Sequence, residues 1–253
     1  MRINEERGLI INTCLGMNGL DLQRRLVSIQ RSVLQDKNEL IGANPSWNIR
    51  TDARITRLNH LFTSLDRTRL GRIFLGELLD DDWFQHNFID ASPQHRIDYA
   101  VGFERSVKYN FGMDFITGIE ISFRIFLRAI DPLACNNTTG AFKAIYECLL
   151  GSRKLNFPTD ERTAAKELLD LSRLLRNLIH NGGVYFSEDG QNETTNYKGE
   201  TYTFQHGQPV NFVYWKLLLE LADDIRQLLV KVISHSIIVS THYIPDPFVV
   251  RFH

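Results

Sequence analysis

Four polar side chains that lie close together in the sequence could act on RNA. They are Arg173, Arg176, Asn177 and His180, in the stretch SRLLRNLIHNGG. In a helix each residue turns by about 100°, so both arginines and the histidine can share one face. Metal-independent cleavage of an RNA phosphodiester needs a group that moves protons, and cations that offset the charge of the phosphate. Histidine titrates near neutrality and a guanidinium can hold two phosphate oxygens, so these residue types suit that reaction.

A single histidine cannot easily serve as both the acid and the base of this reaction. In a symmetric dimer, two copies of His180 across a cleft would supply one of each. The alternative is that Arg173, Arg176 and His180 only complement the negative end of a helix, each by about 0.3 to 1 kcal/mol, and are solvated. Asn177 then orients a neighbour or caps the helix. Exposure of His180 in a cleft would favour catalysis, and burial against the core would favour the alternative.

Amphipathic helices are expected to position these residues. Apolar side chains recur at spacings of three and four over residues 98–130, which predicts a long helix that ends at Asp131-Pro132. Three further helices are predicted, over 141–150, 159–180 and 211–236. The stretch 184–210 carries aromatic residues between glycine turns and predicts a hairpin. The expected fold is mainly α, an up-and-down helical bundle with a small inserted β-hairpin.

An extra helical part precedes this bundle. Its helices are predicted over 19–37, 51–65 and 68–80. The polar stretch 89–96 contains Pro93 and marks the expected boundary. The chain is thus expected to comprise an N-terminal helical region, a bundle and an extended C-terminal tail, over residues 1–95, 96–240 and 241–253.

Charge and cysteine content limit the classes of function. The formal net charge is −1, so any contact with nucleic acid must come from a local patch. The arginines between Arg50 and Arg72 could form such a patch, but compensation by Glu77 and the aspartates at 80–82 explains them better. Three cysteines without a C-x-x-C pair indicate neither a disulfide framework nor a zinc site, which favours a reducing cytoplasm. No stretch approaches the roughly 20 apolar residues of a membrane span, so no membrane contact is expected.

The stretch LLRNLIHNGGVYF, between a bundle-forming helix and a hairpin, resembles the motif of HEPN domains (higher eukaryotes and prokaryotes nucleotide-binding). In that family an arginine, usually followed by a polar residue, and a histidine four to six positions beyond form a metal-independent ribonuclease site in a helical bundle that is often dimeric. Here Arg176 is followed by Asn177 but has only three residues before His180. Arg173 has six but is followed by Leu174, so both arginines stay candidates.

The resemblance also implies an acidic or polar residue on the first helix of the bundle. Glu104 and Glu120 are the available candidates. Glu120 has Arg124 one turn later, so a surface ion pair also explains it.

The resemblance implies an endoribonuclease or RNA-binding protein of a bacterial toxin or defence type. Its expected partners are RNA, a second copy of the chain and a regulatory protein. The alternative is a non-catalytic helical module for dimerisation or partner binding, as in many members of the family. No Walker-type glycine loop, H-E-x-x-H or G-x-S-x-G motif is present, so neither a cofactor nor a metal is expected.

Overall fold

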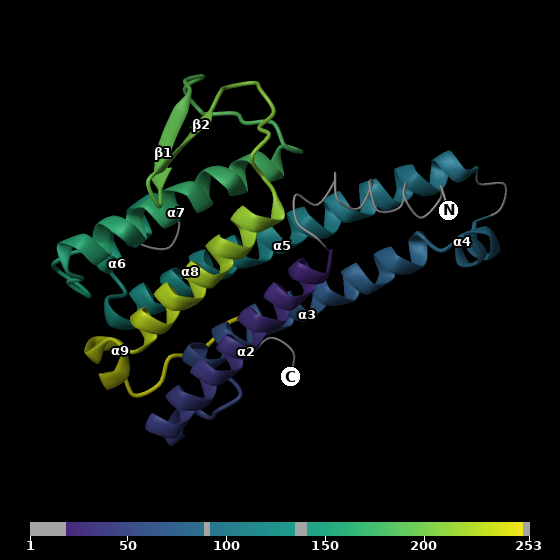
Figure 1. The fold of residues 1–253 in the computed structure, drawn as a ribbon. Coiled ribbons are helices and arrows are strands. Elements are labelled where there is room, and N and C mark those ends of the chain that lie inside the picture. Colours follow the sequence, from purple (N-terminus) through teal and green to yellow (C-terminus); the bar gives the residue numbers. More distant parts are fainter. Residues whose placement is uncertain (1–18, 89–91, 135–140, 250–253) are drawn as a thin grey trace.

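Long helices dominate the structure, a computed structural model that describes residues 19–88, 92–134 and 141–249. In chain order the helices are α2 (Gly19–Ala43), the short η1 (Pro45–Trp47), α3 (Ala53–Leu78), α4 (Asp81–Asn87), α5 (Pro93–Ile130), α6 (Phe142–Leu150), α7 (Thr159–His180), α8 (Trp215–Ile233) and α9 (Ser236–Ser240). Strands β1 (Glu193–Tyr197) and β2 (Glu200–Phe204) form an antiparallel hairpin between α7 and α8. The described chain is therefore mainly α with a small inserted β-hairpin, as expected (Figure 1).

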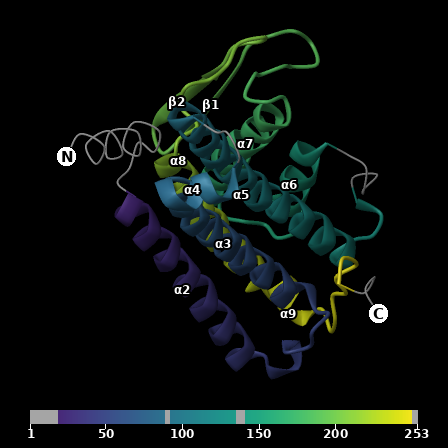
Figure 2. The same cartoon turned by 90° about the vertical axis from the view of Figure 1, so that its right-hand side faces the viewer.

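The helices pack lengthwise, with the hairpin on the outside. Helices α2 and α3 lie side by side, α5 lies between α3 and α7, and α8 contacts α2, α5 and α7 (Figures 1 and 2). Strand β1 packs on α7. The end of α3, helix α4 and the start of α5 extend beyond α7 and α8 as a projecting arm (Figure 1).

Helix α5 carries the apolar stripe that the sequence predicts. Its first turn is closed by a capping box, in which Ser92 and His95 satisfy each other's backbone N–H groups. The helix ends at Ile130, before Asp131-Pro132, because proline cannot continue the hydrogen-bond ladder. The predicted helix over 98–130 is confirmed and begins five residues earlier.

The predicted break between helices over 51–65 and 68–80 is wrong, because α3 continues through it. No glycine or proline interrupts residues 65–68. Thr68 instead donates its hydroxyl to the carbonyl of Ser64 at 2.8 Å, a bond that fits within a continuous helix. The helix begins at Ala53, where the Asp52 side chain accepts from the backbone N–H of Arg54.

Helix α7 ends where the sequence places its C-terminal cap. Gly182 and Gly183 have φ values of 66° and 98°, which residues with a Cβ atom rarely adopt. The N–H of Gly183 donates back to the carbonyl of Leu178 at 2.9 Å. His180 is therefore the last residue of the helix and borders an exposed turn.

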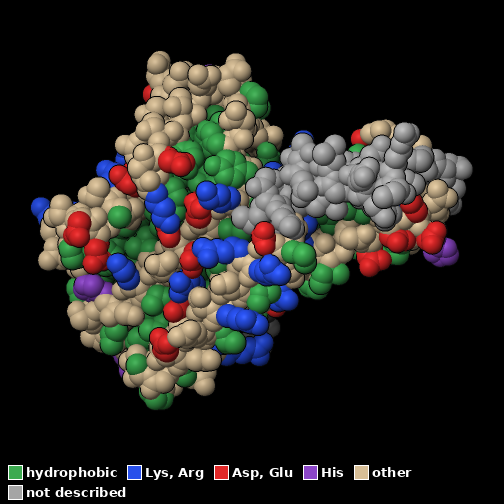
Figure 3. Space-filling model, viewed as in Figure 1, with side chains coloured by type: hydrophobic (Ala, Val, Ile, Leu, Met, Phe, Trp, Pro, Cys, Tyr) green, Lys and Arg blue, Asp and Glu red, His purple; other side chains and the backbone are tan. Residues whose placement is uncertain are grey.

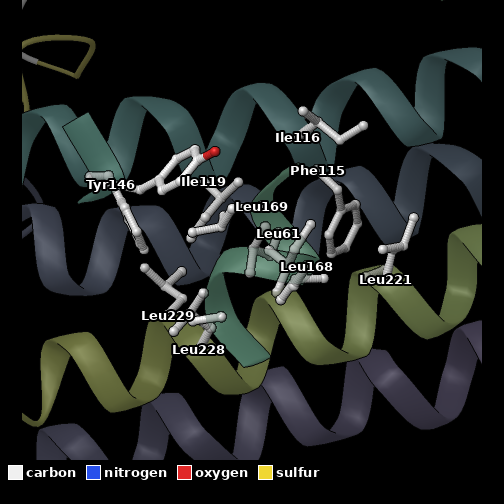
Figure 4. Packing of buried hydrophobic residues seen from close by; sticks show 14 of the residues in the cluster. Leu61, Phe115, Ile116, Ile119, Tyr146, Leu168, Leu169, Leu221, Leu228 and Leu229 are labelled. Atoms are coloured by element: carbon white, nitrogen blue, oxygen red, sulfur yellow. The ribbon is translucent and has the colours of Figure 1, made fainter. Parts of the chain in front are cut away.

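One apolar cluster includes residues from both sides of the expected boundary at 89–96. In Figure 4, Leu61 of α3 lies among Phe115 of α5, Leu168 of α7 and Leu221 of α8. Burial of such side chains is the main favourable term in folding. The division into parts 1–95 and 96–240 stays a prediction, although a shared core means that α3 supports the helices of the bundle.

The C-terminal segment over 241–249 lies against the start of α3. The N–H of Ala53 donates to the carbonyl of Ile244 at 2.8 Å, and the N–H of Asp246 donates to the carbonyl of Thr51 at 2.9 Å. Asp246 is fully buried and accepts from Thr56 and Arg57. The end of the chain is thus tied to α3 by backbone bonds and a buried ion pair.

Two arginines of the stretch between Arg50 and Arg72 bind the C-terminal segment or the start of α3. Arg54 is fully buried, pairs with Asp52 at 2.6 Å, and donates to the carbonyls of Ile238, Thr241 and His242. Arg57 pairs with Asp246. Asp52 and Asp246, rather than the acidic residues at 77 and 80–82, compensate these two arginines, which cannot form a phosphate-binding surface.

Two sequence-based expectations concern the environment of the protein. Among the described helices, none is both long enough and apolar enough to cross a bilayer. Cys148 is disulfide-bonded, a bond that the number and spacing of the cysteines did not indicate. A cytoplasmic location stays a prediction, and the disulfide weighs against it because such bonds are rare in reducing compartments.

Candidate functional site

The second half of α7 carries Arg173, Arg176, Asn177 and His180, and its two arginines reach the hairpin and α5. Their surroundings differ strongly along this helix. Both arginines are held by carboxylates from other elements, whereas His180 is exposed at the helix end. The structure therefore separates the two arginines that the sequence leaves as alternatives.

Arg176 is held by Glu120 of α5. Its Nη1 donates to Glu120 Oε2, while Arg124 donates to Glu120 Oε1 from Nε at 3.1 Å and from Nη2 at 2.8 Å. Glu120 is buried, with 9% of its surface exposed. The predicted pair with Arg124 is present, but it is not a surface pair. A buried carboxylate shared by two guanidinium groups fixes the direction of both.

Arg173 is held by the hairpin. Its Nη2 donates to Glu193 Oε2 at 2.7 Å, and the hydroxyl of Tyr185 donates to Glu193 Oε1. Burial would raise the pKa of Glu193, but the hydrogen bonds from Arg173 and Tyr185 outweigh it, and the pKa is lowered. Burial and the same hydrogen bond raise the pKa of Tyr185. Arg173 therefore joins α7 to β1 and to the segment that precedes it.

His180 and Asn177 have few bonds. The exposed ring of His180 makes no hydrogen bond or ion pair with the described residues, so it is accessible to a ligand. Asn177 is half-buried, and its backbone carbonyl accepts from the Asn181 side chain at 2.8 Å. Close by, a Cβ on Gly183 would lie 3.0 Å from the Tyr109 hydroxyl, which places this aromatic residue of α5 beside the turn.

Glu104, the other acidic candidate on α5, belongs to the core. It is buried and accepts from the indole N–H of Trp215 at 2.6 Å. An indole N–H needs such a partner when it is buried. Of the two acidic residues, Glu120 is therefore the one that reaches the α7 face.

The face of α7 near its C-terminal end combines a histidine, His180, with an arginine, Arg176, whose direction is fixed by Glu120. Arg176 has 33% of its side chain exposed, and a guanidinium has five N–H donors, so donors remain beyond the bond to Glu120. His180 lies one turn further along the helix. Figure 3 shows lysine and arginine side chains among acidic ones over the body of the molecule, with further acidic side chains toward the α4 end of the arm.

Sequence reasoning missed Glu193, Tyr185 and Tyr109 as neighbours of the site. Spacing along the chain gives no signal for them, because each reaches α7 through tertiary packing. Among the described residues, no group of three or more His, Cys, Asp or Glu side chains is arranged to hold a metal ion.

Models of known protein families do not match this chain, and neither do curated proteins or solved structures. We therefore infer its function from the geometry of the site.

Proposed function

We propose that this protein is a HEPN-like, metal-independent endoribonuclease of a bacterial toxin or defence type. The observation that carries the proposal is the exposed His180 one helical turn beyond Arg176, whose guanidinium is fixed by the buried Glu120. Catalysis by proton transfer requires an accessible group. Binding of a phosphate requires a cation with donors to spare.

The reaction is a transesterification within the RNA strand. One His180 takes the proton of the 2′-hydroxyl while O2′ forms a bond to phosphorus, and the bond from phosphorus to O5′ breaks. The second His180, from the other copy in a homodimer, gives a proton to the leaving O5′. Arg176 holds the phosphate oxygens on which negative charge develops. The products are a 2′,3′-cyclic phosphate and a 5′-hydroxyl end.

Arg176 rather than Arg173 suits the role of phosphate ligand. Arg173 is the less exposed of the two, at 21% of its side chain against 33%, and its Nε is buried without a partner. It is also the link between α7 and the hairpin. Moving it to a phosphate would leave Glu193 with only the hydrogen bond from Tyr185 and no cation, which is unfavourable for a partly buried carboxylate.

The nature of the nucleophile provides the test of this proposal. The purified protein is incubated in EDTA with a single-stranded RNA and with the same sequence carrying 2′-O-methyl groups. We expect cleavage of the RNA into products with 2′,3′-cyclic phosphate ends and none of the methylated strand. Equal cleavage of both strands, or none of either by folded protein, would overturn the proposal.

A second candidate function is a non-catalytic module that dimerises with a second copy of this chain. It is favoured by the apolar surface of the projecting arm, where Leu70, Ile73 and Tyr99 are 64%, 58% and 53% exposed. Leu70 and Ile73 lie one turn apart on α3, and contiguous exposed apolar side chains mark interaction sites. Ile73→Asp tests this candidate: if the arm forms an interface, sedimentation will report a smaller assembly than that of the wild type.

A further inference from the structure

A cleft between α6 and α7 lies far from the catalytic face. Its volume is about 260 Å³. It lies at the N-terminal end of α7, and about 27 Å of helix separate Arg162 from His180. The lining residues are Tyr146, Glu147, Leu150, Gly151, Arg162, Thr163 and Lys166.

The side chains that line this cleft carry a net positive charge, and Asp170 behind them also acts on Lys166. Lys166 pairs with Glu147 at 2.8 Å, and this hydrogen bond raises the pKa of Lys166. The guanidinium of Arg162 makes no ion pair or hydrogen bond with the described residues. Glu147 is the one acidic side chain in the lining, so the charge of Arg162 is left without a partner in the cleft.

The available donors come from the two cations. The hydroxyl of Thr163 donates to the carbonyl of Thr159 at 2.8 Å, and the hydroxyl of Tyr146 donates to Asp170. Neither hydroxyl hydrogen is therefore free for a ligand. Arg162 offers a planar set of N–H donors and Lys166 has protons beyond its bond to Glu147, so a ligand here must present several acceptor oxygens and negative charge.

We propose that the cleft between α6 and α7 binds a phosphate group. Parallel N–H groups of a guanidinium match the geometry of phosphate oxygens, and a nearby ammonium adds charge. The volume is below the range for drug-sized ligands and suits a phosphate with little else enclosed. The phosphate belongs either to a free nucleotide or to the 5′ end of an RNA strand, and both present the same chemistry.

Calorimetric titration of the full chain at low ionic strength tests this site. The probes are inorganic phosphate, adenosine monophosphate and an RNA hexamer with and without a 5′-phosphate. We expect Arg162→Ala to weaken phosphate binding by about tenfold, the effect of losing one charged hydrogen bond. Arg50→Ala, which removes an exposed arginine outside the cleft, is expected to change it by less than about twofold.

A variant of the acidic residue Glu147 is expected to change phosphate binding in the opposite direction. Glu147→Gln removes the carboxylate that competes for Lys166 and is expected to strengthen phosphate binding, whereas Glu188→Gln, at an exposed site elsewhere, is not. Tighter binding of adenosine monophosphate than of phosphate would assign the cleft to nucleotides. A preference for the 5′-phosphorylated hexamer over the unphosphorylated one would assign it to RNA ends.

Phosphate binding in the cleft can be tested independently of the ribonuclease proposal. Phosphate binding in the cleft is expected to persist in His180→Ala and in Arg176→Ala, because both residues lie at the other end of α7. No binding of phosphate, or equal binding by the Arg162→Ala and Arg50→Ala variants, would overturn the proposal.

Discussion

Arg176 of α7 and Glu120 of α5 bind each other across the interface of their helices, and Glu120 also accepts from Arg124. The carboxylate is buried, whereas a third of the Arg176 side chain is exposed. This arrangement holds Arg176 through one terminal nitrogen, Nη1, and leaves part of its side chain exposed, one helical turn before His180. A guanidinium held in this way is preorganised for a phosphate.

We expect Glu120→Gln to lower the rate of RNA cleavage by roughly tenfold to a hundredfold, because small displacements of a charged ligand are costly to catalysis. The glutamine keeps the size of the side chain but loses the charge that fixes Arg176. Initial rates in EDTA measure the effect, with Glu188→Gln at an exposed position as the matched control. An unchanged rate in a folded Glu120→Gln protein would show that Glu120 does not position Arg176 for catalysis.

Arg173→Ala separates the two arginines. Because it breaks the bond between α7 and the hairpin, we expect the free energy of unfolding to fall by about 1 to 3 kcal/mol. The cleavage rate per folded molecule is expected to stay near that of the wild type. Urea unfolding and initial rates on the same sample measure both. If the variant keeps its stability but loses cleavage, Arg173 rather than Arg176 is the phosphate ligand.

His60 is expected to make stability depend on pH. Burial, and next the positive charge of Arg57, lower the pKa of His60 in the folded protein, and Arg67, Asp114 and Asp246 also act on it. The unfolded chain, in which a histidine pKa is about 6.5, therefore binds the proton more readily. The contribution of His60 to stability is fully present above about pH 6.5 and is lost as the pH falls through the pKa of His60 in the folded protein. Unfolding in urea at pH 7.5 and 5.0 measures the loss.

The control for this prediction is His60→Leu. The Nδ1 atom of His60 is buried without a hydrogen-bond partner, so leucine removes the titration without breaking a bond to that atom. We expect the variant to lose less stability than the wild type between the two pH values. Equal losses would mean that other groups dominate the acid response.

Asp246→Ala is expected to lower the free energy of unfolding by about 3 to 5 kcal/mol, because it leaves Arg57 buried without its carboxylate. Adding Arg57→Met is expected to restore much of the loss by removing the uncompensated charge. Urea unfolding measures both variants. A small effect of Asp246→Ala, comparable with that of exposed Glu188→Ala, would show that the C-terminal segment contributes little to stability.

The helices that carry the site are predictable because their apolar residues recur with helical spacing. The stripe through Phe111, Phe115 and Phe123 defines α5, and Asn181-Gly182-Gly183 defines the end of α7. Helical geometry also predicts that Arg176 and His180 share a face. The break predicted near residue 66 is absent, and Asp66 and Arg69 there are both bonded to Gln30 of α2.

The partners of the site are not predictable from spacing. Glu120 was visible as a partner of Arg124, four residues away, but its burial and its bond to Arg176 depend on the packing of α5 against α7. Glu193 reaches Arg173 only through the fold of the hairpin. Such contacts depend on tertiary structure, which neither helical periodicity nor local charge pattern encodes.

The most direct test of the central claim is the comparison of His180→Ala with His242→Ala in RNA cleavage. Both variants remove an exposed histidine ring, and His242 lies in the C-terminal segment, away from α7. Purified proteins are incubated with a mixed RNA pool in EDTA, and product formation is followed over time. We predict metal-independent cleavage by the wild type and by His242→Ala, and its loss in His180→Ala. Cleavage by His180→Ala at the rate of the wild type would contradict the assignment of His180 as the catalytic group.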